Sequence, residues 1–187
     1  MNLKPWIKYF ISTFFIISLS FFILSLLIDD NTIEIIAVTL ITTFYQACIR
    51  PLAGSLINMK YHNKMNFNLW WFKERKFERL LYKILKVKRW KTAIPTYDKT
   101  AFDIKEKNIE EILGATCQAE VVHEIMCVLA FVPLLLIIPY GQALVFILTS
   151  IICAFVDCVC IIVQRYNRPR LVKLYKRIVK RNNNLDI

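Results

Sequence analysis

Glycine and charged residues are scarce in this chain of 187 residues. Only 3 residues are glycine, which excludes a collagen-like or glycine-rich low-complexity chain. Charged residues make up 21% of the chain and hydrophobic residues 57%. A soluble domain carries about 25% charged and roughly 45–50% apolar residues. The composition therefore argues against a soluble domain and against disorder.

Cysteine motifs are also lacking. The six cysteines include no Cys-x-x-Cys spacing, and five of them lie in apolar stretches. We interpret them as small, polarizable packing residues rather than as a disulfide or metal framework.

Four apolar stretches are candidates for membrane-spanning helices, at 9–28, 33–49, 121–140 and 143–163. Crossing a bilayer takes about 20 apolar residues of helix. A cleaved signal peptide is the alternative for the first stretch, but its apolar core would be about 7–15 residues, so we favour a retained helix. The second stretch is shorter, and a re-entrant hairpin is its alternative.

Acidic residues number only 14 against 25 lysines and arginines, and the basic residues avoid the apolar stretches. Lys4 and Lys8 precede the first stretch, 15 basic residues lie in 50–107 and 8 in 165–181. The positive-inside rule then predicts a multi-pass protein of the cell membrane with both termini in the cytoplasm. Anionic headgroups attract such residues, so we expect membrane lipids as partners and no nucleic acid.

We therefore predict an all-α integral membrane protein with about four transmembrane helices and cytoplasmic amphipathic helices. The predicted single membrane domain, 1–187, consists of an N-terminal helical hairpin (9–49), a cytoplasmic or interfacial amphipathic segment (50–112), a C-terminal helical hairpin (121–163) and a basic cytoplasmic tail (164–187).

The middle of the chain contains an amphipathic pattern. Apolar residues follow helical spacing from Phe77 to Leu85, after a Trp-Trp-Phe run at 70–72, and lysines and arginines occupy the other face. This pattern is typical of a helix in the headgroup plane. The alternative is a helix that only packs beneath the spans. Pro95 ends the segment, and 96–112 is predicted to be a loop or a short helix.

Glu120 and His123 form the first candidate site, because a spacing of three places both on one helix face. Histidine is the usual general base near neutral pH, and a carboxylate orients it. The alternative is a solvated helix end. Glu-x-x-His is also half of a di-iron signature, but the only other histidine, His62, has no such partner, so no metal is predicted.

The second candidate site is the run from Gln164 to Leu171, which holds three arginines. Guanidinium groups bind phosphate and carboxylate bidentately. Pro169 disfavours the helical conformation of the residue before it and predicts a break or kink there. The alternative is simple anchoring at the membrane surface. Asp157 lies two helical turns earlier, and an acid within a span needs a partner, for which His123, Gln118 or an arginine of this run are candidates.

Three segments together resemble one bacterial membrane family. They are Ile162–Leu171, the tryptophan and basic segment Trp71–Arg75 with Lys83–Lys91 and Pro95, and the Glu-x-x-His segment Ala115–His123. The chain resembles the glycosyl-4,4'-diaponeurosporenoate acyltransferase family, which completes the carotenoid staphyloxanthin, over about residues 70–180.

The resemblance implies transfer of a fatty acyl group to a hydroxyl of a glycolipid or other lipid-linked acceptor at the cytoplasmic face. In this interpretation His123 deprotonates the acceptor hydroxyl and Glu120 holds the imidazole. Arg165, Arg168 and Arg170 hold the phosphates of acyl-CoA, or the phosphate or carboxylate of another carrier, as cosubstrate.

The remaining implied substrate-binding residues supply polar and aromatic contacts, and no tightly bound cofactor is expected. Gln164 and Asn167 donate to the developing oxyanion. The other members of the set are Trp71, Glu74, Arg75, Trp90, Lys91 and Asp157. Two alternatives remain: another small lipid-modifying enzyme, of the methyltransferase or reductase type, and a non-enzymatic accessory subunit that binds anionic lipid.

Overall fold

The structure is a computed structural model that describes residues 4–94, 102 and 107–183, with side chains from Tyr9 onward. The described residues are helical and contain no strand. Within these ranges, four helical stretches are long and apolar enough to cross a membrane: Tyr9–Leu27, Asn31–Tyr61, Ile109–Tyr140 and Ala143–Asn183. The predicted all-α class with about four such helices is confirmed.

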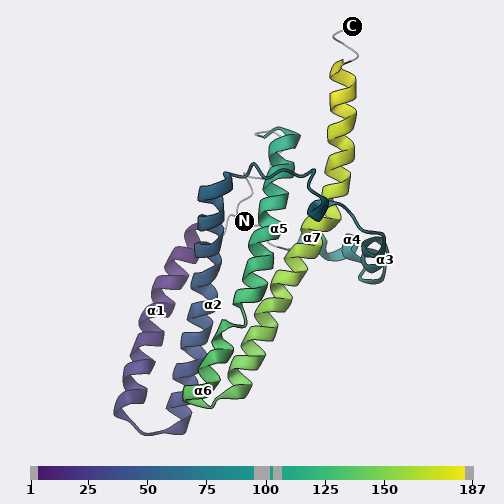
Figure 1. Cartoon of the computed structure of the whole chain (residues 1–187). Coiled ribbons are helices and arrows are strands. Elements are labelled where there is room, and N and C mark those ends of the chain that lie inside the picture. The colour runs from purple at the N-terminus through teal and green to yellow at the C-terminus, as the bar shows by residue number, and fades with distance from the viewer. Residues whose placement is uncertain (1–3, 95–101, 103–106, 184–187) are drawn as a thin grey trace. The chain divides into compact units, whose positions relative to one another are not determined.

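The chain divides into two compact units. One comprises Leu3–Leu56 and Glu124–Cys158, and the other Ile57–His123 and Val159–Ile187 with the first two residues. Helices α2 (Asn31–Tyr61), α5 (Ile109–Leu129) and α7 (Ala143–Asn183) contribute to both units (Figure 1).

The first unit begins with the hairpin of α1 (Lys4–Leu27) and α2. The Asp30 carboxylate starts α2, because it accepts hydrogen bonds from the backbone N–H groups of Thr32 (2.7 Å) and Ile33 (3.2 Å). These bonds lower the pKa of the Asp30 carboxyl. The segment 33–49 lies within one unbroken helix rather than a re-entrant hairpin, and that helix continues through Pro51.

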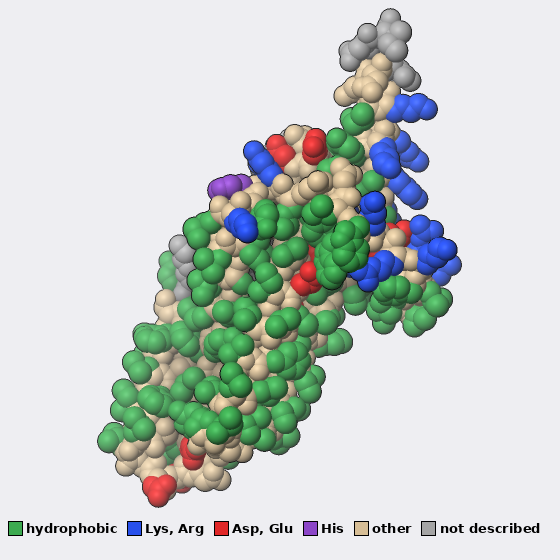
Figure 2. All heavy atoms as spheres, viewed as in Figure 1, with side chains coloured by type: hydrophobic (Ala, Val, Ile, Leu, Met, Phe, Trp, Pro, Cys, Tyr) green, Lys and Arg blue, Asp and Glu red, His purple; other side chains and the backbone are tan. Residues whose placement is uncertain are grey.

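Side chains of α2 form hydrogen bonds with the backbone carbonyls at the end of α5, which have no partner within the helix. The α2 residues Tyr45 and Gln46 donate to the carbonyls of Leu129 (3.0 Å) and Ala130 (2.9 Å), at the end of α5. Beyond them lie η4 (Val132–Leu136) and α6 (Ile137–Tyr140). Hydrophobic side chains cover the visible surface of α1 and α2 (Figure 2), as expected for helices that face lipid.

The second unit contains the short elements η1 (Trp70–Phe72), α3 (Lys76–Ile84), α4 (Val87–Trp90) and η2 (Lys91–Ala93). The α3 side chains Phe77, Leu80 and Ile84 are 61–66% exposed, whereas Glu78 and Tyr82 are buried. The apolar face of the amphipathic helix is therefore not packed against the protein. Pro95 and most of the predicted loop at 96–112 lie outside the described residues.

Helix α5 begins twelve residues before the predicted start of the third apolar stretch. The side-chain oxygen Oδ1 of Asn108 accepts from the Glu111 backbone N–H (2.8 Å), and the side-chain NH2 group of Asn108 donates to the Glu111 carboxylate (3.2 Å). This reciprocal cap starts the helix at Ile109. Glu120 and His123 consequently lie well inside a helix and not at its end.

Helix α7 begins at the predicted residue, Ala143, but the predicted break near Arg168 is wrong: the helix runs through Pro169 to Asn183. An internal proline costs about 3 kcal/mol because it removes one backbone bond. The Arg170 guanidinium donates to the Tyr166 carbonyl (2.6 Å) beside the proline, and the contacts of this part of α7 described below offset the local cost.

Candidate functional site

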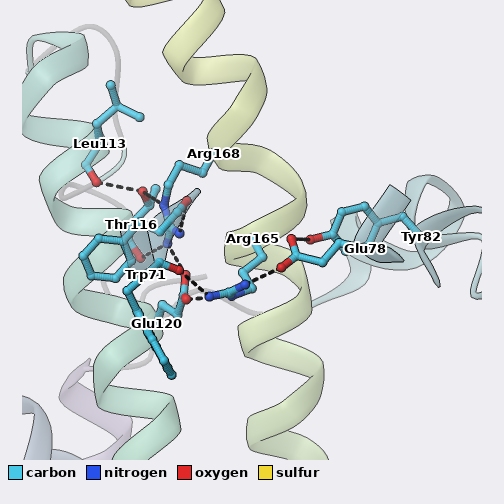
Figure 3. A network of polar contacts seen from close by, with 9 residues as sticks. Trp71, Glu78, Tyr82, Leu113, Thr116, Glu120, Arg165 and Arg168 are labelled. Carbon is cyan, nitrogen blue, oxygen red and sulfur yellow. Dashed lines mark hydrogen bonds and ion pairs between the residues drawn. The ribbon is translucent and has the colours of Figure 1, made fainter. Parts of the chain in front are cut away.

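A buried ionic network lies in the second unit and is centred on Glu120, which is 0% exposed. One Glu120 oxygen accepts from Arg165 Nε (2.7 Å), and the other accepts from Arg168 Nη2. Arg165 Nη1 also donates to Glu78 on α3, whose other oxygen accepts from the Tyr82 hydroxyl at 2.9 Å (Figure 3). Two glutamates and two arginines balance the charge, as burial requires.

The two arginines are held by further bonds to the backbone. Arg165 Nη2 donates to the Trp71 carbonyl (2.7 Å). Arg168 is 2% exposed, donates to the Thr116 carbonyl (3.2 Å), and places its guanidinium 4.8 Å from the centre of the Phe72 ring. These guanidinium groups therefore tie η1, α3, α5 and α7 together, and an incoming phosphate would have to compete with the glutamates for them.

Tyr82 is buried beside this network, and its surroundings keep the phenol protonated. Desolvation and its bond to the Glu78 carboxylate raise the pKa of the Tyr82 phenol. The phenol is thus held as a neutral donor, and its ring packs edge-on against Tyr166 with centroids 5.3 Å apart. Val87 completes this small core, with Trp90 and Ile162 packed against it.

His123 lies one helical turn after Glu120 on α5 and is half-buried. Gln118, on the same helix, accepts from the Asn63 backbone N–H (2.8 Å) and donates to Asn58 (3.0 Å). Gly114 lets the helix approach this turn closely, because a Cβ there would lie 2.5 Å from the Asn63 carbonyl oxygen. The segment that carries Glu120 and His123 is therefore fixed against the end of α2 as well as against α7.

A second group of polar residues surrounds the Tyr166 ring. The Lys91 ammonium donates to Asn167 Oδ1 (2.7 Å) and lies 5.1 Å from the ring centroid of Tyr166. The Arg170 guanidinium lies 3.7 Å from the same centroid. Burial, and to a lesser extent the charge of Arg170, lower the pKa of Lys91. The structure thus brings together three residues predicted to bind substrate: Lys91, Asn167 and Arg170.

The other predicted residues of the tryptophan segment lie at the surface of the same unit. Trp71 is 40% exposed, and the Arg75 guanidinium lies 5.6 Å from its ring centroid. Glu74 pairs with Arg79 (2.9 Å). The Trp90 indole N–H donates to the Leu85 carbonyl (2.8 Å). Trp90 thus has a role in packing, whereas Trp71 and Arg75 remain accessible. Gln164, the last of the predicted substrate-binding residues, lies on α7 and is half-buried.

Asp157 has a partner that the sequence did not indicate. Its carboxylate is buried in the first unit and accepts two hydrogen bonds from Arg50 on α2, at 2.8 and 3.0 Å. Arg50 directly follows the second apolar stretch, where the charge pattern predicts the basic cytoplasmic segment. Charge in an apolar environment is stable when it is paired and hydrogen-bonded, which this bidentate contact achieves.

Glu78 and Tyr82 are the site residues that sequence reasoning missed. They are four residues apart and so share one face of α3. Glu78 is one of only two acids among the residues from Trp71 to Lys91, where arginines and lysines dominate. An isolated acid four residues before a tyrosine on the face opposite Phe77, Leu80 and Ile84 was the available signal. Within the described ranges, no cluster of three or more His, Cys, Asp or Glu side chains has the geometry to hold a metal ion.

The comparison with known protein families gives one match. The family of glycosyl-4,4'-diaponeurosporenoate acyltransferase matches residues 68–177, which include both the network around Glu120 and the group around Tyr166. No curated protein and no solved structure is significantly similar to the chain. Since the match covers more than half of the chain, the protein belongs to the glycosyl-4,4'-diaponeurosporenoate acyltransferase family.

Proposed function

We propose that the protein is an integral-membrane O-acyltransferase that transfers a fatty acyl group to a hydroxyl of a glycolipid or another lipid-linked acceptor at the cytoplasmic membrane face. The family match, which includes the Glu-x-x-His helix, is the observation that carries this proposal. The four long apolar helices support it, because both the acceptor and the acyl chain are lipids.

His123 is the proposed catalytic base. Its imidazole takes the proton of the acceptor hydroxyl while that oxygen attacks the acyl carbonyl, and the bond between the acyl carbon and the donor's leaving atom then breaks. The proton on His123 returns to the leaving group. A neutral imidazole is suited to this exchange because its ordinary pKa lies near neutral pH.

Glu120 is proposed to act as a positioning residue. Its two oxygens accept from Arg165 and Arg168, so it fixes the helical turn before His123 against α7. Gln164 and Asn167 are the proposed donors to the oxyanion, and Lys91 sets the orientation of the Asn167 amide by occupying its oxygen.

The surface of the second unit supports an orientation at the membrane. The exposed apolar side chains of α3 and the exposed Trp70 and Trp71 favour insertion of this unit into the headgroup region. Lysines and arginines gather over α3 and the last part of α7 (Figure 2) and complement anionic lipids. We therefore propose that this unit lies at the cytoplasmic surface of the cell membrane, with both termini on that side.

Comparative lipid mass spectrometry tests the proposal. Cells that lack the protein are compared with cells that express the wild type, His123→Asn or His62→Asn. The two variants remove one histidine each by the same substitution, and His62 is exposed in the turn after α2. Asparagine also tolerates the positive φ of 48° at His62.

We expect a lipid that gains one fatty-acyl mass with the wild type and with His62→Asn, but not with His123→Asn. That lipid names the acceptor. Acyl transfer that persists in His123→Asn would refute the role of His123. A lipidome that is identical in all four strains would refute acyl transfer and favour the non-enzymatic alternative.

A further inference from the structure

Lys91 and Arg170 form a pair of positive charges that has no acidic partner among the residues that the structure describes. Both lie against the ring of Tyr166, at 5.1 and 3.7 Å from its centroid. Among the described residues, no carboxylate is within ion-pair distance of either cation. Arg165 and Arg168, on the same helix, are instead neutralised by Glu78 and Glu120.

The three arginines of the run from Gln164 to Leu171 therefore differ in whether they are free to bind a ligand. Arg168 is 2% exposed and Arg165 uses Nε, Nη1 and Nη2 in hydrogen bonds, so neither presents a free fork. Arg170 is exposed, and its hydrogen bond in the structure uses only Nη1. A guanidinium has five N–H donors, so most of those of Arg170 remain for a ligand.

The repulsion between Lys91 and Arg170 is the physical reason to expect an anion here. Burial lowers the pKa of Lys91, and the nearby charge of Arg170 lowers it further. A ligand that places negative charge near both cations would offset this repulsion. The ring of Tyr166 holds both cations in place, and Asn167 Oδ1 fixes the Lys91 ammonium further by accepting its hydrogen bond at 2.7 Å.

We propose that Lys91 and Arg170 form a phosphate-binding site, and that this site holds the phosphorylated part of the acyl donor. The guanidinium fork of Arg170 matches two phosphate oxygens, and Lys91 supplies a compact second charge. Phosphate binding is thereby assigned to Lys91 and Arg170, whereas Arg165 and Arg168 have a structural role. The identification of the ligand as the acyl donor rests on the proposed function, but the phosphate site itself does not.

Two donors present this chemistry, and binding to the purified full-length protein in an uncharged maltoside detergent distinguishes them. One titration uses coenzyme A, whose phosphates are soluble. The other uses phosphatidylglycerol in mixed micelles, whose phosphate belongs to a lipid. Each is measured by calorimetry for the wild type, Lys91→Met, Arg170→Gln and the control Arg177→Gln, which removes an exposed charge farther along the same helix.

Saturable binding of coenzyme A identifies a soluble thioester donor, and saturable binding of phosphatidylglycerol alone identifies a phospholipid donor. In either case Lys91→Met and Arg170→Gln should each raise Kd at least about tenfold, which corresponds to about 1.4 kcal/mol. Arg177→Gln should leave Kd within about twofold of the wild type, a difference of less than 0.5 kcal/mol by the same conversion.

Three results would overturn the inference: no saturable binding of either ligand, an equal loss in Arg177→Gln, or unchanged binding in Lys91→Met and Arg170→Gln. Lys91→Arg keeps the positive charge and should retain binding. Binding lost in Lys91→Met but kept in Lys91→Arg is therefore due to the lost charge and not to a general intolerance of substitution at this position. The proposed function is judged separately by lipid mass spectrometry. Phosphate binding without acyl transfer would support the phosphate site and refute the proposed reaction. Acyl transfer without phosphate binding at these residues would support the reaction and refute the site.

Discussion

Replacing Glu120 by glutamine should destabilise the protein by far more than the loss of one surface charge. Glu120 is 0% exposed and neutralises Arg168, which is 2% exposed, and it shares Arg165 with Glu78. The variant retains one glutamate and two arginines, so the network carries one uncompensated buried charge. Removing one partner of a buried ion pair costs about 3–5 kcal/mol. A domain is stable by only about 5–15 kcal/mol, so the effect should be large.

Thermal unfolding in detergent, followed with a thiol-reactive fluorophore, measures this cost. Cys117 lies on α5 one turn before Glu120 and is 0% exposed, so in a chain whose other five cysteines are replaced by alanine its reaction reports the opening of this unit. Glu74→Gln is the matched control. Glu74 pairs with Arg79, whose side chain is 73% exposed, and an exposed pair contributes about 0–1 kcal/mol.

A double variant tests the cause of the destabilisation. Glu120→Gln combined with Arg168→Met removes one charge of each sign, so the remaining pair of Glu78 and Arg165 is again balanced. This double variant should be more stable than Glu120→Gln alone, because the orphaned buried charge is gone. If Glu120→Gln costs no more than Glu74→Gln, or if the second change adds a further loss, the buried network is not what stabilises this unit.

Three further predictions concern other parts of the chain. Gly114→Ala should destabilise the protein by about 1–3 kcal/mol, because its Cβ would lie 2.5 Å from a backbone oxygen. In the control Gly54→Ala the new Cβ meets nothing within 4 Å, so a thermal midpoint that falls only in Gly114→Ala is expected. The sulfurs of Cys127 and Cys158 are 3.7 Å apart, so copper–phenanthroline should oxidise the two thiols to a disulfide, with loss of two hydrogens by mass spectrometry; no such product would contradict the packing of these helix segments. Phosphate binding should weaken as the pH rises through the pKa of Lys91, which lies below its ordinary 10.5, and Lys91→Arg should remove this dependence in titrations at successive pH values; an equal dependence in both proteins would refute it.

The sequence by itself determined which segments are apolar helices and what family the chain resembles. Apolar stretches of about 20 residues are stable across a bilayer rather than in water, so the positions of the four long helices follow from hydropathy alone, including the start of α7 at Ala143. The helix ends were less predictable. Helix α5 begins at the Asn108–Glu111 cap, which lies before the start of the apolar pattern. Helix α7 continues through Pro169, because its packing outweighs the local tendency of proline to interrupt a helix.

Only the tertiary structure decided what the charged residues do. Glu120 and Arg165 are 45 residues apart and Glu78 and Arg165 are 87 apart, and no local periodicity links such positions. A single sequence shows that three arginines occur together, but not that two of them turn inward to glutamates while Arg170 stays exposed. That difference depends on desolvation and on partners from α3 and α5, and these exist only once the helices have packed.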